Sequence, residues 1–388
     1  MDLHLTPEQT AFREEVRAFI AQRLPAEIRD RLQRGMPPRR QDTVAWQRML
    51  NERGWAAPNW PREHGGAGLG ITEQLLLIDE LALANAPQPL VFNISMLGPA
   101  LIRFGTDAQK RELLPRLASL DLWFCQGFSE PGAGSDLASL KTTATREGDF
   151  YTVQGQKIWT TGAHNADWMF ALVRTEKLPR KQDGISFLLI DLRSAGVRIR
   201  PITTLDGMHH VNEVFFDQVR VPLANIVGTE GQGWSVAKYL LEHERTTIVN
   251  VGQCRERLAY ARTLARHVSL GNTSLAGDAA LKLELAWLDA EVRALEITTW
   301  RFLTDTAQAP ASWASLLKLK GVDLYQQIMA LLARIAGPDG MERIALEGAN
   351  PSEWQAPLIP RYFHSRASSI AGGSSEVQKE IIAKLTLG

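Results

Sequence analysis

A carboxylate stands in the apolar face of a predicted helix in the segment LLEHERTTI, residues 240–248. At about 100° per residue, Glu244 lies on the same face as Leu240 and Ile248. Glu242 falls on the opposite face, where a lysine and an arginine can pair with it. Burial raises the pKa of a carboxyl group, and a raised pKa suits a general base that works near neutral pH. The pattern leaves two interpretations, because Glu244 could be a catalytic base or one half of a buried ion pair with a distant arginine.

Two further segments carry residue types that suit a bound ligand. In GFSEPGAGSDLASLK, residues 127–141, small residues around a Ser-Glu-Pro turn leave backbone N–H groups free to meet an anion or the polar edge of an aromatic ring. In KIWTTGAHNADW, residues 157–168, Trp159 and Thr161 alternate on one face of a predicted strand. The ordinary alternatives are a surface loop for the first segment and core packing for Trp159.

The segment IAGGSSEVQKEII, residues 370–382, predicts a glycine turn that leads into a helix. Either Ser374 or Ser375 could cap that helix. A helix start favours negative groups such as a phosphate or a flavin edge, although a plain helix cap explains the same residues. The pair His209-His210 is interpreted as a turn, and no metal role is assigned to it.

The elements that must position these groups follow a helix, sheet, helix order. Helical spacing of apolar residues begins after a capping box with proline at the first helical position, Thr6–Gln9. Short β-rich runs follow, and among them Gln154-Gly155 is interpreted as a tight turn between two strands. Helical periodicity returns from Gly233 onwards. The chain is therefore predicted to be an α+β protein, mostly α, with an N-terminal helical domain (1–121), a middle β domain (122–232) and a C-terminal helical domain (233–388).

Composition narrows the class of protein. The chain has 388 residues, of which 45% are apolar, and its 43 basic and 43 acidic side chains balance. Balanced charge and the absence of a basic run argue against nucleic acid as a partner. The N-terminal sequence lacks the features of a signal peptide, and no window approaches the ~18 consecutive apolar residues of a membrane span. Two well-separated cysteines predict neither a disulfide scaffold nor a zinc site, so we expect a cytoplasmic protein.

Four motifs in order give the chain a resemblance to a known family. SEPGAGSD, GQKIWTTGAHNADW, GQGW with LLEHER, and AGGSSEVQKEII together resemble the acyl-CoA dehydrogenase family, and RGWAAPNWPREHGG extends the match to the N-terminal part. The resemblance implies that the C-terminal domain is a four-helix bundle and that FAD lies between it and the β domain. It also implies oxidation of an acyl-CoA thioester to the trans-2-enoyl-CoA, as in β-oxidation of fatty acids. A carboxylate then removes the α-proton, the flavin N5 takes the β-hydrogen as hydride, and electrons pass to an electron-transfer flavoprotein.

The resemblance implies roles for individual residues. Ser135 and Gly373 match positions that contact the acyl-CoA, and Glu242 and Arg245 match the helix beside it. The Thr161 hydroxyl matches a group close to the flavin N5. The residues that match cofactor-contacting positions are Gln126, Phe128, Ser129, Gly134, Ser135, Trp159, Thr161, Ser374, Ser375 and Glu376.

The chain departs from the family at the position of the base. Many members have a glutamate where this chain has Gly372, which can abstract nothing. A smaller group, resembling isovaleryl- and long-chain acyl-CoA dehydrogenases, has the base on the earlier helix immediately before an arginine. Here that residue is Glu244, the same glutamate that the helical spacing places on the apolar face. The resemblance therefore favours Glu244 as the catalytic base.

Two groups that normally complete the FAD site of a neighbouring subunit are missing. The R-x-x-F-G motif has no clear counterpart near LARHVSLGN, where Arg266 is a poor substitute, and RIAGPDG has Arg334 at the position of the family's glutamine. These losses resemble two-component acyl-CoA dehydrogenases, in particular the large chain of bacterial pimeloyl-type enzymes. The chain is expected to form a homo-oligomer or a hetero-oligomer with a related chain. A flavin monooxygenase on the same fold and a non-catalytic partner subunit are the alternatives.

Overall fold

The computed structural model describes residues 4–33, 36–244, 251–270, 273–304, 312–338 and 358–387, with the backbone alone for residues 242–244, 270 and 273. Long-range contacts divide the chain into two compact units. The first unit comprises Met1–Asp42, Leu69–Gln88 and Arg245–Gly388, and the second comprises Thr43–Gly68 and Pro89–Glu244. Part of the N-terminal helical region thus shares one unit with the C-terminal helices, and the rest belongs to the other unit with the sheet.

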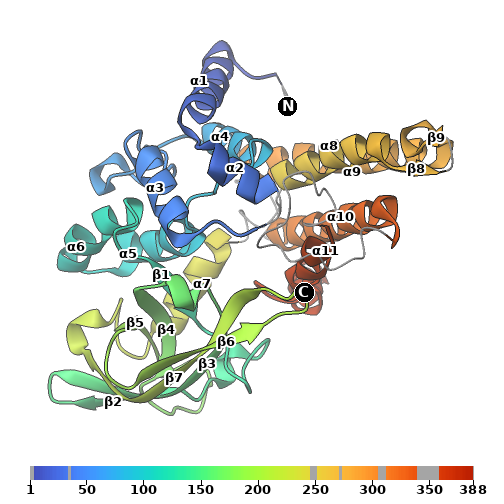
Figure 1. Ribbon diagram of the computed structural model, residues 1–388. Coiled ribbons are helices and arrows are strands. Elements are labelled where there is room, and N and C mark those ends of the chain that lie inside the picture. The colour runs from blue at the N-terminus through green and yellow to red at the C-terminus, as the bar shows by residue number, and fades with distance from the viewer. Residues whose placement is uncertain are drawn as a thin grey trace. The chain divides into compact units, whose positions relative to one another are not determined.

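The first unit is built from helices. The predicted capping box starts α1, because Gln9 N–H donates to Thr6 Oγ1 at 3.2 Å and Thr6 N–H donates to Gln9 Oε1 at 3.1 Å. Gly252 allows a close approach, since a Cβ there would lie 2.8 Å from the Ala82 side chain. The helices of this unit are α1 (Pro7–Arg23), α2 (Ala26–Gln33), α4 (Ile71–Leu83), α8 (Val251–His267), α9 (Ala279–Thr304), α10 (Trp313–Ala336), α11 (Leu358–Arg366) and α12 (Ser375–Leu387), and a short β8–β9 pair (Ser269–Leu270, Thr273–Ser274) follows α8 (Figure 1).

The second unit is centred on a seven-stranded sheet with the order β1-β4-β2-β3-β7-β6, in which β5 also pairs with β4 (Figure 1). Its strands are β1 (Phe124–Gly127), β2 (Thr143–Glu147), β3 (Phe150–Thr161), β4 (Trp168–Arg174), β5 (Ile185–Asp191), β6 (Val197–Thr203) and β7 (His209–Pro222). Its helices are α5 (Gly98–Phe104), α6 (Asp107–Ala118), α7 (Gly233–Glu244), the π-helix Phe92–Leu97 and most of α3 (Arg40–Asn51).

The apolar run of β4 follows from burial on both faces of the sheet. Phe170 and Leu172 pack into the core that includes residues of α5, α6 and α7, whereas Met169, Ala171 and Val173 pack into a second core with residues of β3, β5 and β7. Successive side chains of a strand point to opposite faces, so a strand buried on both sides is apolar throughout. The expected order of N-terminal helices, middle β region and C-terminal helices is confirmed. Within the described ranges, no helix combines the length and apolar character of a membrane span.

Two local predictions were wrong. Gln154-Gly155 is not a turn between two strands, because β3 continues through it with a register shift at Gly155. Gly155 has φ of +149°, and a Cβ there would lie 2.6 Å from Thr142 Oγ1. A glycine is therefore needed at this β-bulge, where the backbone passes close to Thr142 of the neighbouring segment. His209 and His210 are the first residues of β7, and the turn lies at residues 205–207.

Candidate functional site

A buried ion pair fixes the loop that follows β1. Lys157 of β3 is fully buried, and its Nζ donates to Glu130 Oε1 at 2.8 Å and to the Phe128 carbonyl at 3.2 Å. Glu130 also accepts the backbone N–H groups of Lys141 and Thr142 at 2.6 and 2.9 Å. Burial lowers the pKa of Lys157 to about 8. Burial alone would raise the pKa of Glu130, but Lys157 and the N–H donors bring it below its usual value, so both groups are charged at neutral pH.

The loop itself presents backbone and small side chains. The Phe128 ring packs edge-on against Phe170 and Phe187, with centroids 5.9 and 6.3 Å apart, so this residue offers a ligand only its backbone. The Ser129 carbonyl accepts the Ile158 N–H at 2.9 Å, which joins the loop directly to β3. The loop residues therefore have a fixed position relative to the end of β3.

The side-chain amide of Gln126 has an unused hydrogen-bond donor in the described structure. Its Nε2 is buried and makes no hydrogen bond within the described structure. An unsatisfied buried donor costs roughly 1–3 kcal/mol, which an acceptor on a bound ligand would recover. In the loop that follows β1, Gly134 and Ser135 are exposed, and no described atom lies within 4 Å of a Cβ placed on Gly134. These residues fit a polar ligand edge.

Trp159 stands out by its backbone and by its exposure. Its φ is +60°, within a register shift of β3 between Lys157 and Thr160, and its side chain is 58% exposed. The core-packing interpretation of Trp159 was therefore wrong. A left-handed conformation in a bulky residue costs about 1–3 kcal/mol and persists only where the surroundings impose it. Here Asn212 Nδ2 donates to the Thr160 carbonyl at 3.0 Å, and the neighbouring Thr161 is exposed as well.

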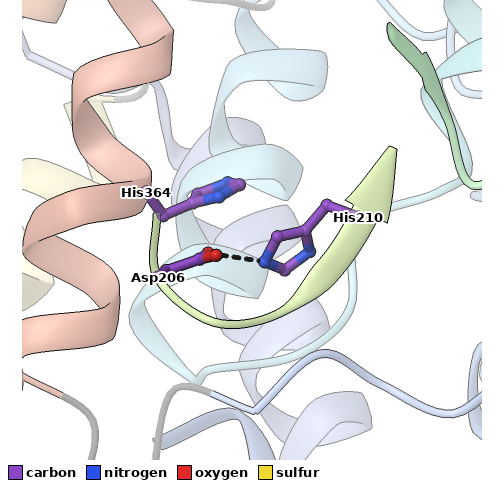
Figure 2. A group of neighbouring side chains, drawn as sticks. All are labelled: Asp206, His210 and His364. Carbon is purple, nitrogen blue, oxygen red and sulfur yellow. Dashed lines mark hydrogen bonds and ion pairs between the residues drawn. The ribbon is translucent and has the colours of Figure 1, made fainter. Parts of the chain in front are cut away.

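The start of β7 supports this strand end through side chains. Asn212 is fully buried, its Nδ2 lies 3.2 Å from His164 Nδ1, and its Oδ1 lies 2.7 Å from His209 Nε2. The two imidazole rings are 4.0 Å apart between centroids. Figure 2 shows the neighbouring hydrogen bond of 2.8 Å between His210 Nε2 and Asp206 Oδ2. Because an amide oxygen accepts and an amide nitrogen donates, His209 donates through Nε2 and His164 accepts through Nδ1.

In the first unit, two buried side chains orient the turn before α12. Lys318 of α10 is 2% exposed, and its Nζ donates to the Ala371 carbonyl at 2.5 Å and to the Gly373 carbonyl. Gln378 Nε2 lies 3.3 Å from the carbonyls of Gly372 and Gly373. The C=O and N–H of one peptide point in opposite directions. Because Lys318 binds the Ala371 and Gly373 carbonyls, the N–H groups of Gly372 and Ser374 face away from Lys318. Gly372 and Gly373 have φ of +64° and +92°, and successive N–H groups in such a turn form an anion-binding concavity.

Of the two serines that could cap α12, Ser374 does so. The Val377 N–H donates to Ser374 Oγ at 3.4 Å, whereas Ser375 is the first residue of the helix. Glu376 is exposed in the first turn, where its own backbone N–H and then the Ser374 hydroxyl lower its pKa. This helix start therefore favours negative charge, as the sequence predicted.

The predicted base lies at the limit of the described chain. Glu242 and Glu244 belong to the last turn of α7, but their side chains, and Arg245 entirely, lie outside the described residues. Earlier in the helix, Leu240 is fully buried and Lys238 is exposed, so the apolar face of the predicted wheel is the buried face. The role of Glu244 stays a prediction.

Comparison with known proteins decides the family. Three domain models match in sequence order: the acyl-CoA dehydrogenase N-terminal domain at residues 6–121, the middle domain at 125–219 and the C-terminal domain at 231–387. The chain belongs to the acyl-CoA dehydrogenase family. It is therefore an oxidoreductase, and members of this family are flavoproteins.

Full-length relatives agree with this assignment. The acyl-CoA dehydrogenase IpdE1 of Mycobacterium tuberculosis is 37% identical over 385 residues, which cover 97% of each protein. The ChsE4-ChsE5 complex of Mycobacterium tuberculosis contains a chain that is 33% identical, with a TM-score of 0.86 and coverage of 100% of this chain and 99% of that one. The Tcur3481-Tcur3483 steroid ACAD contains a chain that is 30% identical, with a TM-score of 0.88 and the same coverage.

Sequence reasoning missed the residues that hold the family motifs in place. Lys157, Glu130 and Asn212 support the strand end and the loop of the second unit, and Lys318 and Gln378 support the turn before α12. A signal existed for the two lysines, since each stands in a largely apolar stretch, GQKIWTT or SLLKLKGV. A lysine is almost never fully buried unless it is paired, so such positions deserve a search for acceptors.

Replacing Lys318 with methionine is expected to disorganise the turn before α12 and to lower flavin affinity by roughly tenfold or more. Each buried carbonyl that loses its donor costs about 1–3 kcal/mol. Equilibrium dialysis of FAD and the KM and kcat for an acyl-CoA would measure the effect. Lys320→Met is the matched control, because Lys320 is a partly exposed lysine of the same helix that pairs with Glu291. Equal flavin affinity and turnover in the two variants would refute the positioning role.

Proposed function

We propose that this chain is the catalytic subunit of an FAD-dependent acyl-CoA dehydrogenase that converts an acyl-CoA to the trans-2-enoyl-CoA. The observation that carries this proposal is the end of strand β3, where Trp159 and Thr161 are exposed. The Ile158 N–H beside them donates to the Ser129 carbonyl and so joins this strand end to the loop that follows β1. The strained backbone at Trp159 is maintained by buried hydrogen bonds, as expected of a surface that must meet a ligand in one geometry.

The residues present fit a flavin. The unpartnered amide of Gln126 suits the polar edge of the ring system, and the exposed indole of Trp159 suits its face. The Thr161 hydroxyl can donate a hydrogen bond to a ring nitrogen. The other groups that would hold the cofactor are the backbone at Phe128 and Ser129, the exposed loop at Gly134 and Ser135, and the helix start at Ser374, Ser375 and Glu376. When bound, the flavin supplies the two-electron oxidant of the reaction.

The chain's own chemical contribution is proton removal. Removal of the α-proton of a thioester requires a base, and Gly372, at the family's usual position, has no side chain to supply one. We assign this role to Glu244, which the helical spacing of the sequence predicts to lie on the apolar face of its helix. Ser135, Glu242, Arg245 and the backbone of Gly373 are proposed to contact the acyl-CoA.

A second chain is proposed to complete the assembly. The structural relatives ChsE4-ChsE5 and Tcur3481-Tcur3483 are each named as a pair of chains. In this chain Arg334, at the position of the family's glutamine, pairs with Glu284 of α9, so that side chain has a partner within its own bundle. A related chain would then supply the missing FAD contacts, and an electron-transfer flavoprotein would accept the electrons.

Purified protein co-expressed with its related chain is expected to be yellow with FAD and to bleach when an acyl-CoA is added without oxygen. The visible spectrum would be recorded with short, long and steroid-derived acyl-CoA thioesters, the last because one structural relative is described as a steroid ACAD. A preparation that takes up no FAD with any related chain would disprove the proposal. Oxygen consumption coupled to substrate hydroxylation would point instead to a monooxygenase.

A further inference from the structure

Two arginine side chains lie together inside the first unit. Arg257 of α8 is 4% exposed, and its Nε donates to Glu256. Its Nη1 is buried and makes no hydrogen bond to any part of the structure that is described. Arg361 of α11 is partly buried, faces Arg257, and donates through Nη2 to the Leu32 carbonyl. One guanidinium thus has an unused buried donor beside a second guanidinium.

Among the residues that the structure describes, the charges of this group do not balance. Arg257 and Arg361 carry two positive charges, and the carboxylate that faces them is Glu256, which also accepts from Asn85 Nδ2 at 3.3 Å. Burial first, and Arg257 second, lower the pKa of Arg361 to about 10, so it keeps its charge at neutral pH. Burial raises the pKa of the neighbouring Tyr325, so that phenol is neutral there and supplies no negative charge. An uncompensated buried cation is costly unless an anion accompanies it.

We propose that Arg257 and Arg361 form a binding site for a carboxylate. A carboxylate carries the single negative charge that the group lacks, whereas a phosphate at neutral pH would bring more than one. A guanidinium presents parallel N–H donors whose spacing matches the two oxygens of a carboxylate, and Arg257 Nη1 is such a donor without an acceptor. The aromatic ring of Tyr260, 5.3 Å from Arg257 Cζ, forms one wall of the site.

The carboxylate has two possible sources with the same chemistry. One is the far end of the acyl group of the substrate, which would make the preferred substrate an acyl-CoA with a terminal carboxylate. This source rests on the proposed function. The other is a small free carboxylate that binds as a stabilising ion, independently of turnover.

The first experiment needs no catalysis. The melting temperature of the full chain, in complex with its partner chain if one co-purifies, would be measured in sodium propionate and in sodium chloride at equal ionic strength. Propionate is expected to raise the melting temperature of the wild type above its value in chloride. It should do so equally in Arg262→Gln, which changes a partly exposed arginine of α8, and not in Arg257→Gln or Arg361→Gln. If propionate and chloride have the same effect on the wild type, the proposal is wrong, and this result requires no variant to fold.

The second experiment identifies the source. The ratio of kcat/KM for adipyl-CoA to that for hexanoyl-CoA is expected to fall by roughly tenfold or more in Arg257→Gln, because a charge-assisted hydrogen bond is lost. The ratio should be unchanged in Arg262→Gln. Such a fall assigns the site to the substrate, whereas an unchanged ratio together with the propionate effect assigns it to a free carboxylate. If no acyl-CoA is oxidised, the proposed function fails, while the melting experiment still decides the carboxylate site.

Discussion

Replacing Glu244 with glutamine is expected to abolish reduction of the flavin by substrate while FAD and acyl-CoA still bind. The amide has the size and shape of the carboxylate but cannot accept the α-proton. General base catalysis contributes roughly 10²–10⁴-fold, and the loss of a sole base should reach the upper end of that range. Single-turnover flavin reduction in anaerobic stopped flow measures this step directly.

The neighbouring carboxylate provides the control. Glu242 lies two residues earlier in the sequence, so a helical spacing of about 100° per residue predicts that it lies on the opposite face from Glu244. Glu242→Gln should therefore leave the rate of flavin reduction within a few-fold of the wild type, even if substrate affinity changes. Flavin reduction at the wild-type rate in Glu244→Gln would contradict the base assignment, and it would favour a monooxygenase, which needs no carboxylate base.

The sequence predicted the local structure correctly where it depends on residues close together in the chain. The buried face of α7, the strand β4 and the capping box at Thr6 all follow from side chains that are close in sequence. The change from helical spacing to β-rich runs and back predicted the three-part architecture, and the order of the four family motifs led to the family. These features depend on spacing within a few residues or on the order of motifs along the chain.

Local periodicity could not predict how the site is supported. Glu130 and Lys157 are 27 residues apart, and Lys318 is 53 residues from Ala371. Contacts over such separations cannot be recognised from the spacing of residues within one helix or strand. Core packing was the ordinary alternative for Trp159, because aromatic residues in strands are usually buried. A register shift and a positive φ, maintained by Asn212 of another strand, turn its side chain outward instead.

Gly155 shows the same limit of local sequence patterns. The dipeptide Gln154-Gly155 is consistent with a hairpin turn, and sequence alone could not tell that the glycine accommodates Thr142. A glycine inside a strand pattern indicates a bulge or a close approach as readily as a turn. The difference depends on the neighbouring segment, which lies outside the local window.

Replacing Lys157 with methionine is expected to lower the free energy of unfolding by roughly 3–5 kcal/mol and to release the loop after β1. Methionine fills the space but leaves Glu130 as a buried charge that keeps only its backbone donors, and removal of one partner of a buried pair has a cost of this size. Urea unfolding with and without FAD would measure both effects. FAD should stabilise the variant far less than the wild type, because the Phe128 and Ser129 backbone would no longer be fixed.

The matched control for Lys157 is Lys181, whose Nζ lies 2.8 Å from Asp136 in the same region. That pair is exposed on both sides, and surface ion pairs contribute little, so Lys181→Met should unfold close to the wild type. The double variant Lys157→Met with Glu130→Gln should recover part of the lost stability, since no uncompensated buried charge then remains. If Lys157→Met unfolds at the same urea concentration as Lys181→Met, the buried pair does not fix the loop. In that case the loop depends on its other hydrogen bonds, such as the one from the Ile158 N–H to the Ser129 carbonyl.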